Sequence, residues 1–134
     1  MSVSLTPTHS SAPTILVVED SDVVRTLTGR MLVEEGYPVV TAIDGVEAIE
    51  VLEQCSIGAV LTDIKMPRTD GHELAVQIAV RWPDLRMLFM TGHPEAELTR
   101  DLPGPLLMKP FTPEALAAAV RELVTNRNGG LASA

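Results

Sequence analysis

The chain has 134 residues, of which 46% are hydrophobic and 21% are charged, as is typical of one globular domain. A net charge of −8 with only two lysines, Lys65 and Lys109, argues against direct nucleic-acid binding, which needs clustered basic side chains. The single cysteine, Cys55, excludes an internal disulfide and a multi-cysteine zinc site. We find neither an apolar run long enough for a membrane span nor a signal peptide, and therefore expect a cytoplasmic protein that does not bind membranes.

Five short apolar runs alternate with segments of helical periodicity along most of the chain. The runs are 15–18, 39–42, 59–62, 87–90 and 105–108. Each run is continuous, which is typical of strands that are buried on both faces of a sheet. Between the runs, apolar residues recur at helical spacing, as at Leu74 and Ile78. Gly36 marks the end of the first helix, and Thr112 before Pro113 marks the start of the last.

This alternation of strand and helix predicts an α/β fold, in which a doubly wound parallel sheet of five strands carries helices on both faces. We expect the folded domain to span residues 14–126. The ends, 1–13 and 127–134, are expected to be flexible tails. One helical segment, around 95–102, is short and weakly patterned, so the fourth helix is expected to be short or irregular.

Polar residues follow the predicted strands at the points where the strands end. Glu19 and Asp20 follow the first run, and Asp63 follows the third. Thr91 follows the fourth run, and Lys109 follows the fifth. In open parallel sheets, ligands bind outside the carboxyl ends of the strands. We therefore expect three carboxylates, a hydroxyl and an ammonium group to converge at one edge of the sheet.

Each of these residues also has a simpler interpretation when it is taken alone. Glu19 and Asp20 suit a helix N-terminus, Asp63 suits a turn, Thr91 can be a strand-end hydroxyl, and Lys109 can be a surface charge. Their coincidence favours a site, because crowded carboxylates raise each other's pKa unless a cation lies among them. Oxygen ligands favour Mg²⁺. A metal, an ammonium and a hydroxyl around one carboxylate suit phosphoryl transfer, with Asp63 as the nucleophile.

Four motifs, each after a predicted strand, resemble the receiver domain of two-component response regulators, of the single-domain type or the type attached to hybrid histidine kinases. The motifs are Ile-Leu-Val-Val-Glu19-Asp20, Thr-Asp63-Ile-Lys-Met-Pro through Gly71, Met-Thr91-Gly92, and Lys109-Pro110-Phe111. The resemblance covers residues 14–126 and implies a flavodoxin-like (βα)5 fold with strand order 2-1-3-4-5.

The resemblance implies how a phosphoryl group would be bound. Asp63 would accept the group, Thr91 would donate a hydrogen bond to one of its oxygens, and Lys109 would pair with another. The backbone N–H groups of Lys65 and Gly92 would complete the phosphate-binding site.

The resemblance also implies a metal site for Mg²⁺ (or Mn²⁺). Asp20, Asp63 and the backbone carbonyl of Lys65 would be direct ligands, and Glu19 would act through a metal-bound water. The bond before Pro110 would be a cis peptide bond, which is a known use of proline.

The function that the resemblance implies is that of a signalling domain in a phosphorelay. The domain would take its phosphoryl group from a histidine kinase or a histidine phosphotransfer protein and would signal by conformational change. Its only catalysis would be its own phosphorylation and slow autodephosphorylation. It would act as a monomer or a phosphorylation-dependent dimer.

The sequence departs from the family pattern at the expected switch position. Leu106 stands where the family usually has Tyr or Phe, and leucine has neither a ring to bury nor a hydroxyl. The stretch between Thr91 and Lys109 is also shorter than usual. We hypothesise that segment 92–105 reorders on phosphorylation in place of the aromatic switch.

Two alternative functions remain open from the sequence alone. Asp20-Ser21-Asp22 resembles the start of haloacid-dehalogenase-type phosphatases, although the Gly-Thr expected next is Val23-Val24 and Asp63 has no role in that scheme. A degenerate receiver that binds partners without phosphorylation is the other alternative.

Overall fold

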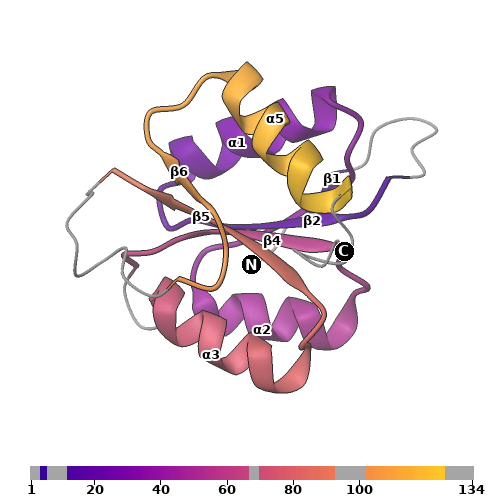
Figure 1. The fold of residues 1–134 in the computed structure, drawn as a ribbon, viewed down its shortest axis with the longest axis vertical. Helices are drawn as coiled ribbons and strands as arrows, with labels where there is room; N and C mark the ends of the chain where they lie inside the picture. The colour runs from indigo at the N-terminus through magenta and orange to yellow at the C-terminus, as the bar shows by residue number, and fades with distance from the viewer. Residues whose placement is uncertain (1–3, 6–11, 67–69, 93–101, 126–134) are drawn as a thin grey trace.

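A parallel sheet is the centre of the computed structural model, which describes residues 4–5, 12–66, 70–92 and 102–125 (Figure 1). Its five parallel strands are β2 (Ile15–Val18), β3 (Val39–Ala42), β4 (Ala59–Asp63), β5 (Arg86–Thr91) and β6 (Leu106–Met108). They are ordered β3-β2-β4-β5-β6. The predicted α/β class and strand order are therefore confirmed.

Helices cover both faces of the sheet. They are α1 (Asp22–Glu34), α2 (Gly45–Gln54), α3 (Gly71–Arg81) and α5 (Pro113–Thr125). Helices α1 and α5 lie on one face, and α2 and α3 lie on the other (Figure 1). Among the described helices, none has the length and apolar character that crossing a membrane requires. The fourth helical segment predicted around 95–102 falls largely on residues 93–101, which lie outside the described residues.

The strands place their side chains alternately in two apolar clusters, one on each face. Leu16, Val60 and Phe89 belong to the cluster that includes residues of α2 and α3. Ile15 and Leu61 belong to the cluster that includes residues of α1 and α5. Because both faces of β2 and β4 are covered, every residue of these two strands is buried. This rigid centre fixes the positions of the strand ends.

Helix ends follow the signals read from the sequence. The N–H of Gly36 donates to the carbonyl of Val33, and the N–H of Tyr37 donates to the carbonyl of Leu32, both at 3.0 Å. This pair of bonds ends α1 and requires the positive φ of 100° that Gly36 adopts. At the start of α5, the N–H of Ala115 donates to Thr112 Oγ1 at 3.0 Å.

A sixth strand, which the sequence analysis did not predict, extends the sheet. Strand β1 (Ser4–Leu5) pairs antiparallel with β3, with Ser4 opposite Val40 and Leu5 opposite Val39. It lies within the segment 1–13 that we expected to be a flexible tail. Two residues in a segment rich in Ser, Thr and Pro show no periodicity, so no pattern in the sequence indicates this strand. The extent of both tails stays a prediction, since residues 1–3, 6–11 and 126–134 lie outside the described ranges.

Gly71 makes the closest backbone contact near the end of β4. Its N–H donates to the carbonyl of Ile64 at 2.6 Å. A Cβ atom at this position would lie 2.7 Å from the carbonyl oxygen of Asp63 and 2.8 Å from the Cα of Ile64. Both contacts are with backbone, which cannot rotate away as a side chain can.

We therefore expect Gly71→Ala to lower the free energy of unfolding by about 1–3 kcal/mol, the usual range for overpacking. Urea denaturation measures this change. Gly92→Ala is the matched control, because its Cβ would meet only Lys109 Cβ, at 4.0 Å, and should change stability by less than about 0.5 kcal/mol. Equal stability of the two variants would contradict the close approach at Gly71.

Candidate functional site

Three carboxylates meet at the carboxyl end of the sheet. Glu19 and Asp20 directly follow β2, and Asp63 is the last residue of β4. Each offers an oxygen atom, and these oxygens all lie within 4.8 Å of one another. Glu19 and Asp63 are buried, whereas Asp20 is exposed. The parallel pairing of β2 with β4 creates this cluster, because it brings residues distant in sequence to the same edge.

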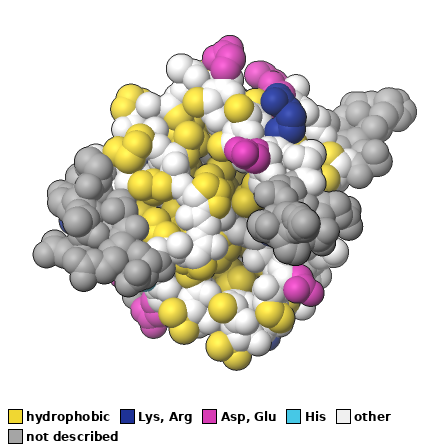
Figure 2. All heavy atoms as spheres, in the orientation of Figure 1, with side chains coloured by type: hydrophobic (Ala, Val, Ile, Leu, Met, Phe, Trp, Pro, Cys, Tyr) yellow, Lys and Arg dark blue, Asp and Glu magenta, His cyan; other side chains and the backbone are white. Residues whose placement is uncertain are grey.

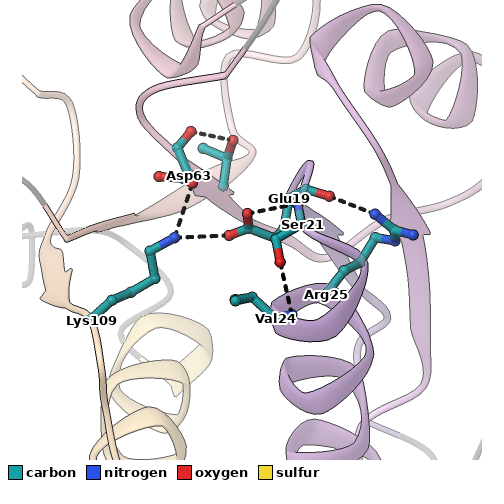
Figure 3. A network of polar contacts seen from close by, with 7 residues as sticks. Glu19, Ser21, Val24, Arg25, Asp63 and Lys109 are labelled. Atoms are coloured by element: carbon teal, nitrogen blue, oxygen red, sulfur yellow. Dashed lines mark hydrogen bonds and ion pairs between the residues drawn. The ribbon is translucent and has the colours of Figure 1, made fainter.

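Lys109 joins this cluster from the end of β6. Its Nζ donates to Glu19 Oε1 at 3.1 Å and to Asp63 Oδ2 at 3.0 Å (Figure 3). Its backbone N–H donates to the carbonyl of Thr91 at 2.8 Å, which continues the pairing of β6 with β5. One ammonium group therefore bridges two carboxylates that lie 44 residues apart in the chain (63 minus 19).

Burial and charge shift the pKa values of two members of the cluster. Burial raises the pKa of Glu19 above its usual value, and the nearby charge of Asp63 raises it further. Hydrogen bonds from the Ser21 N–H and from Lys109 lower the pKa, but they do not cancel the rise. Burial opposes the charged form of Lys109, but its hydrogen bonds and charge attraction to Asp63 and Glu19 outweigh this, so its pKa is raised. Lys109 therefore remains an ammonium at neutral pH and balances part of the negative charge.

The donor set of the cluster fits a hard divalent cation. All three side chains offer oxygen, which Mg²⁺ prefers over nitrogen and sulfur ligands. Asp20 is exposed, so this side of the cluster is open to solvent. Such access suits Mg²⁺, because this ion usually keeps several of its bound waters in protein sites. Glu19, Asp20 and Asp63 are therefore the residues that could hold such an ion.

The other predicted site residues lie at the same edge of the sheet. Thr91 is buried at the end of β5. Lys65 and Gly92 are exposed, two residues after Asp63 and one after Thr91. Their contacts with a phosphoryl group or a metal stay predictions. The Lys109–Pro110 peptide bond is cis.

The predicted switch residue lies on an edge strand. Leu106 is 37% exposed and is paired with Phe89, and Met108 on the same strand is 41% exposed. Figure 2, in the orientation of Figure 1, shows hydrophobic side chains gathered across the middle of the visible face of the molecule. They lie between the layer of α1 and α5 and the layer of α2 and α3. Most of segment 92–105, which we hypothesised to reorder, lies outside the described residues.

The sequence analysis missed two side chains that support the cluster. Arg25, in the first turns of α1, donates through Nη1 to the carbonyl of Glu19 at 2.9 Å (Figure 3). Thr62, which is buried in β4, donates through Oγ1 to the carbonyl of Asp63 at 2.9 Å. Both contacts are with backbone oxygens, so no pattern of residue types in the sequence indicates them.

The geometry does not favour the phosphatase alternative. That scheme needs Asp22 as the acid beside Asp20, yet the side chain of Asp22 is 87% exposed and forms an ion pair with Arg25. Asp63, which has no role in that scheme, belongs to the cluster and pairs with Lys109.

Comparisons with known proteins agree with this geometry. Residues 15–121 match the family described as the response regulator receiver domain. The sensor kinase CckA of Brucella abortus is 35% identical over 125 residues, which cover 89% of this chain and 13% of that protein. The response regulator receiver protein CpdR of the same organism is 37% identical over 101 residues, which cover 72% of this chain and 84% of CpdR.

A solved structure shows the same fold. The response regulator TrrA of Thermotoga maritima, in complex with Mg²⁺-BeF, is 30% identical, with a TM-score of 0.77 and coverage of 84% of this chain and 99% of that chain. Several curated relatives are longer, and the chain spans only 50% of the response regulator MprA of Mycobacterium sp. strain KMS. From the family match and the similarity to CpdR, the chain belongs to the receiver domains of two-component response regulators.

Proposed function

We propose that this receiver domain accepts a phosphoryl group on Asp63 in a phosphorelay. The observation that carries the proposal is the position of the Asp63 carboxylate, 3.0 Å from the Lys109 ammonium and grouped with two further carboxylates. An anionic nucleophile beside an ammonium group and a cluster of carboxylates that could hold a divalent cation suits a transferring phosphoryl group, whose charge must be balanced as it arrives.

In the proposed reaction, an Asp63 carboxylate oxygen attacks the phosphorus of a phosphohistidine. The phosphorus–nitrogen bond breaks, an acyl phosphate forms, and the histidine ring leaves with its electron pair and takes up a proton. Lys109 would pair with one phosphoryl oxygen, Thr91 would donate to another, and the N–H groups of Lys65 and Gly92 would bind the rest. Mg²⁺ or Mn²⁺, held by Asp20, Asp63 and the Lys65 carbonyl, with Glu19 acting through a water, would supply further positive charge at these oxygens.

The donor of the phosphoryl group would be a histidine kinase or a histidine phosphotransfer protein. Val23 and Leu27 support this proposal, because they lie four residues apart on α1, the helix that follows Glu19 and Asp20, and are 67% and 48% exposed. We propose that they contact the partner. Leu106 offers no ring or hydroxyl, so we further propose that the signal does not use an aromatic switch. The domain would be cytoplasmic, and a monomer or a dimer formed on phosphorylation.

The phosphoacceptor can be tested by intact mass after incubation with acetyl phosphate and Mg²⁺. We expect one alkali-labile phosphoryl group on the wild type, and none on Asp63→Asn or without the metal. Asp84→Asn is the matched control, because Asp84 is exposed in the turn between α3 and β5, at the other end of the sheet, and should leave the adduct unchanged. If the wild type gains neither a phosphoryl group nor NMR shift changes with beryllofluoride, the binding-module alternative replaces this proposal.

Lys109 has a second effect that follows from its two ion pairs. Its ammonium already pairs with Glu19 and Asp63, which are two of the three carboxylates that a divalent cation would use, and balances part of their negative charge. Lys109 and the cation must therefore repel each other while sharing the same ligands.

We expect Lys109→Met to bind Mg²⁺ about tenfold more tightly, because removing a nearby like charge contributes on the order of 1–3 kcal/mol at a partly exposed site. Isothermal titration calorimetry measures this affinity. Without metal, the variant should be less stable by about 1–3 kcal/mol, because buried Glu19 loses its cationic partner. Arg81→Met is the matched control, since Arg81 pairs with Glu53 away from the cluster and should leave the affinity unchanged. Weaker Mg²⁺ binding by Lys109→Met would contradict the proposed competition.

A further inference from the structure

The turn between β2 and α1 carries two of the three clustered carboxylates. It begins at Glu19, whose backbone N–H donates to the carbonyl of Ala42 at 3.1 Å. The Glu19 carboxylate is held on both sides, by the Ser21 N–H at 3.1 Å and by Lys109 at 3.1 Å. The carbonyl of Glu19 lies beyond the last residue of β2, so it needs a partner from outside the sheet.

Arg25 is that partner. Its Nη1 donates to the Glu19 carbonyl at 2.9 Å (Figure 3). Its Nη2 forms an ion pair with Asp22. The Arg25 side chain is only 16% exposed, whereas Asp22 is 87% exposed. The planar guanidinium can make both contacts at once because its donors have a fixed geometry. The contact with Glu19 is the more shielded of the two.

The peptide group that Arg25 holds is the one between Glu19 and Asp20. Its carbonyl belongs to Glu19 and its nitrogen belongs to Asp20, and the group is planar. Fixing the direction of this carbonyl therefore fixes the orientation of the peptide plane. The Cα atoms of Glu19 and Asp20 lie at the two ends of this plane, and the two side chains project from them. A rotation of this plane would move both carboxylates relative to Asp63.

We propose that Arg25 is a positioning residue for divalent-cation binding, which it supports by holding the Glu19–Asp20 peptide so that both carboxylates face Asp63. The inference rests on the proposed function, because it assumes that the cluster binds Mg²⁺. Arg25 itself touches neither the cation nor the phosphoryl group in this scheme. Its contribution is the orientation of the ligands before the ion arrives.

Charge and orientation predict opposite effects of removing Arg25. If Arg25 acted only through its charge, Arg25→Met would raise the affinity for Mg²⁺, because a cation near the site would be lost. If Arg25 positions the ligands, the same variant should lower the affinity, since outer contacts of this kind typically contribute about tenfold or more to metal binding. The sign of the change therefore separates the two roles, and a purely structural role predicts no change in the affinity of the folded protein.

The experiment measures Mg²⁺ affinity by isothermal titration calorimetry, with circular dichroism to verify folding. We expect Arg25→Met to weaken binding about tenfold. Arg30→Met removes the same charge from an exposed position on the same helix and should not weaken it. Asp22→Asn removes the ion pair but keeps the contact with Glu19, so it should weaken binding much less than Arg25→Met does. If Arg25→Met does not fold, Arg25→Lys replaces it, because the shorter and non-planar ammonium group cannot reproduce both contacts and should also weaken binding.

The outcomes distinguish this inference from the proposed function. Unchanged or tighter binding by folded Arg25→Met or Arg25→Lys, with normal binding by the wild type, overturns the positioning role alone. Failure of the wild type to bind Mg²⁺ overturns the metal site of the proposed function and the inference with it. Equal weakening by Arg30→Met also overturns the inference, because the effect would then not depend on the Glu19 carbonyl.

Discussion

Crowding of negative charge at one edge of a parallel sheet is the constraint on which the site depends. The alignment of β2 with β4 brings Glu19, Asp20 and Asp63 within a few ångströms, and two of the three are shielded from water. Isolated buried carboxylates are strongly unfavourable unless they are paired. Lys109 supplies that pairing, and it reaches the cluster only because the neighbouring strands β5 and β6 are also parallel. The ion pairs therefore depend on the strand order.

The backbone beneath the cluster is constrained as closely as its side chains. The carbonyl of Asp63 accepts a hydrogen bond from Thr62 and leaves no room for a Cβ at Gly71. The carbonyl of Glu19 is held by Arg25. Charged side chains that repel one another would move apart if their backbone allowed it. Close packing at these points holds the carboxylates together, although their like charges repel one another.

Strand positions and the polar residues after them could be predicted from the sequence because they depend on chain order alone. Buried parallel strands are continuous apolar runs, and their carboxyl ends must share an edge, so the order of residues was enough to group Glu19, Asp63 and Lys109. Strand β1 could not be predicted, because its pairing with β3 depends on a tertiary contact and not on a periodic pattern. Arg25 could not be identified for a similar reason, since its partner is a backbone carbonyl and any arginine on α1 would look the same in the sequence.

Lys109 has opposing consequences for a cation in this site. With three carboxylates and no ammonium, the cluster would be less stable in the absence of a metal and would bind the ion more tightly. The two ion pairs of Lys109 stabilise the metal-free arrangement, and the same charge weakens the attraction for a divalent cation. The exposed Asp20 carboxylate then remains available to an incoming ion without rearrangement of the buried groups. Such a site would favour exchange of a bound cation with solvent over permanent retention, which suits the proposed reaction, in which phosphoryl oxygens must enter and leave the same space.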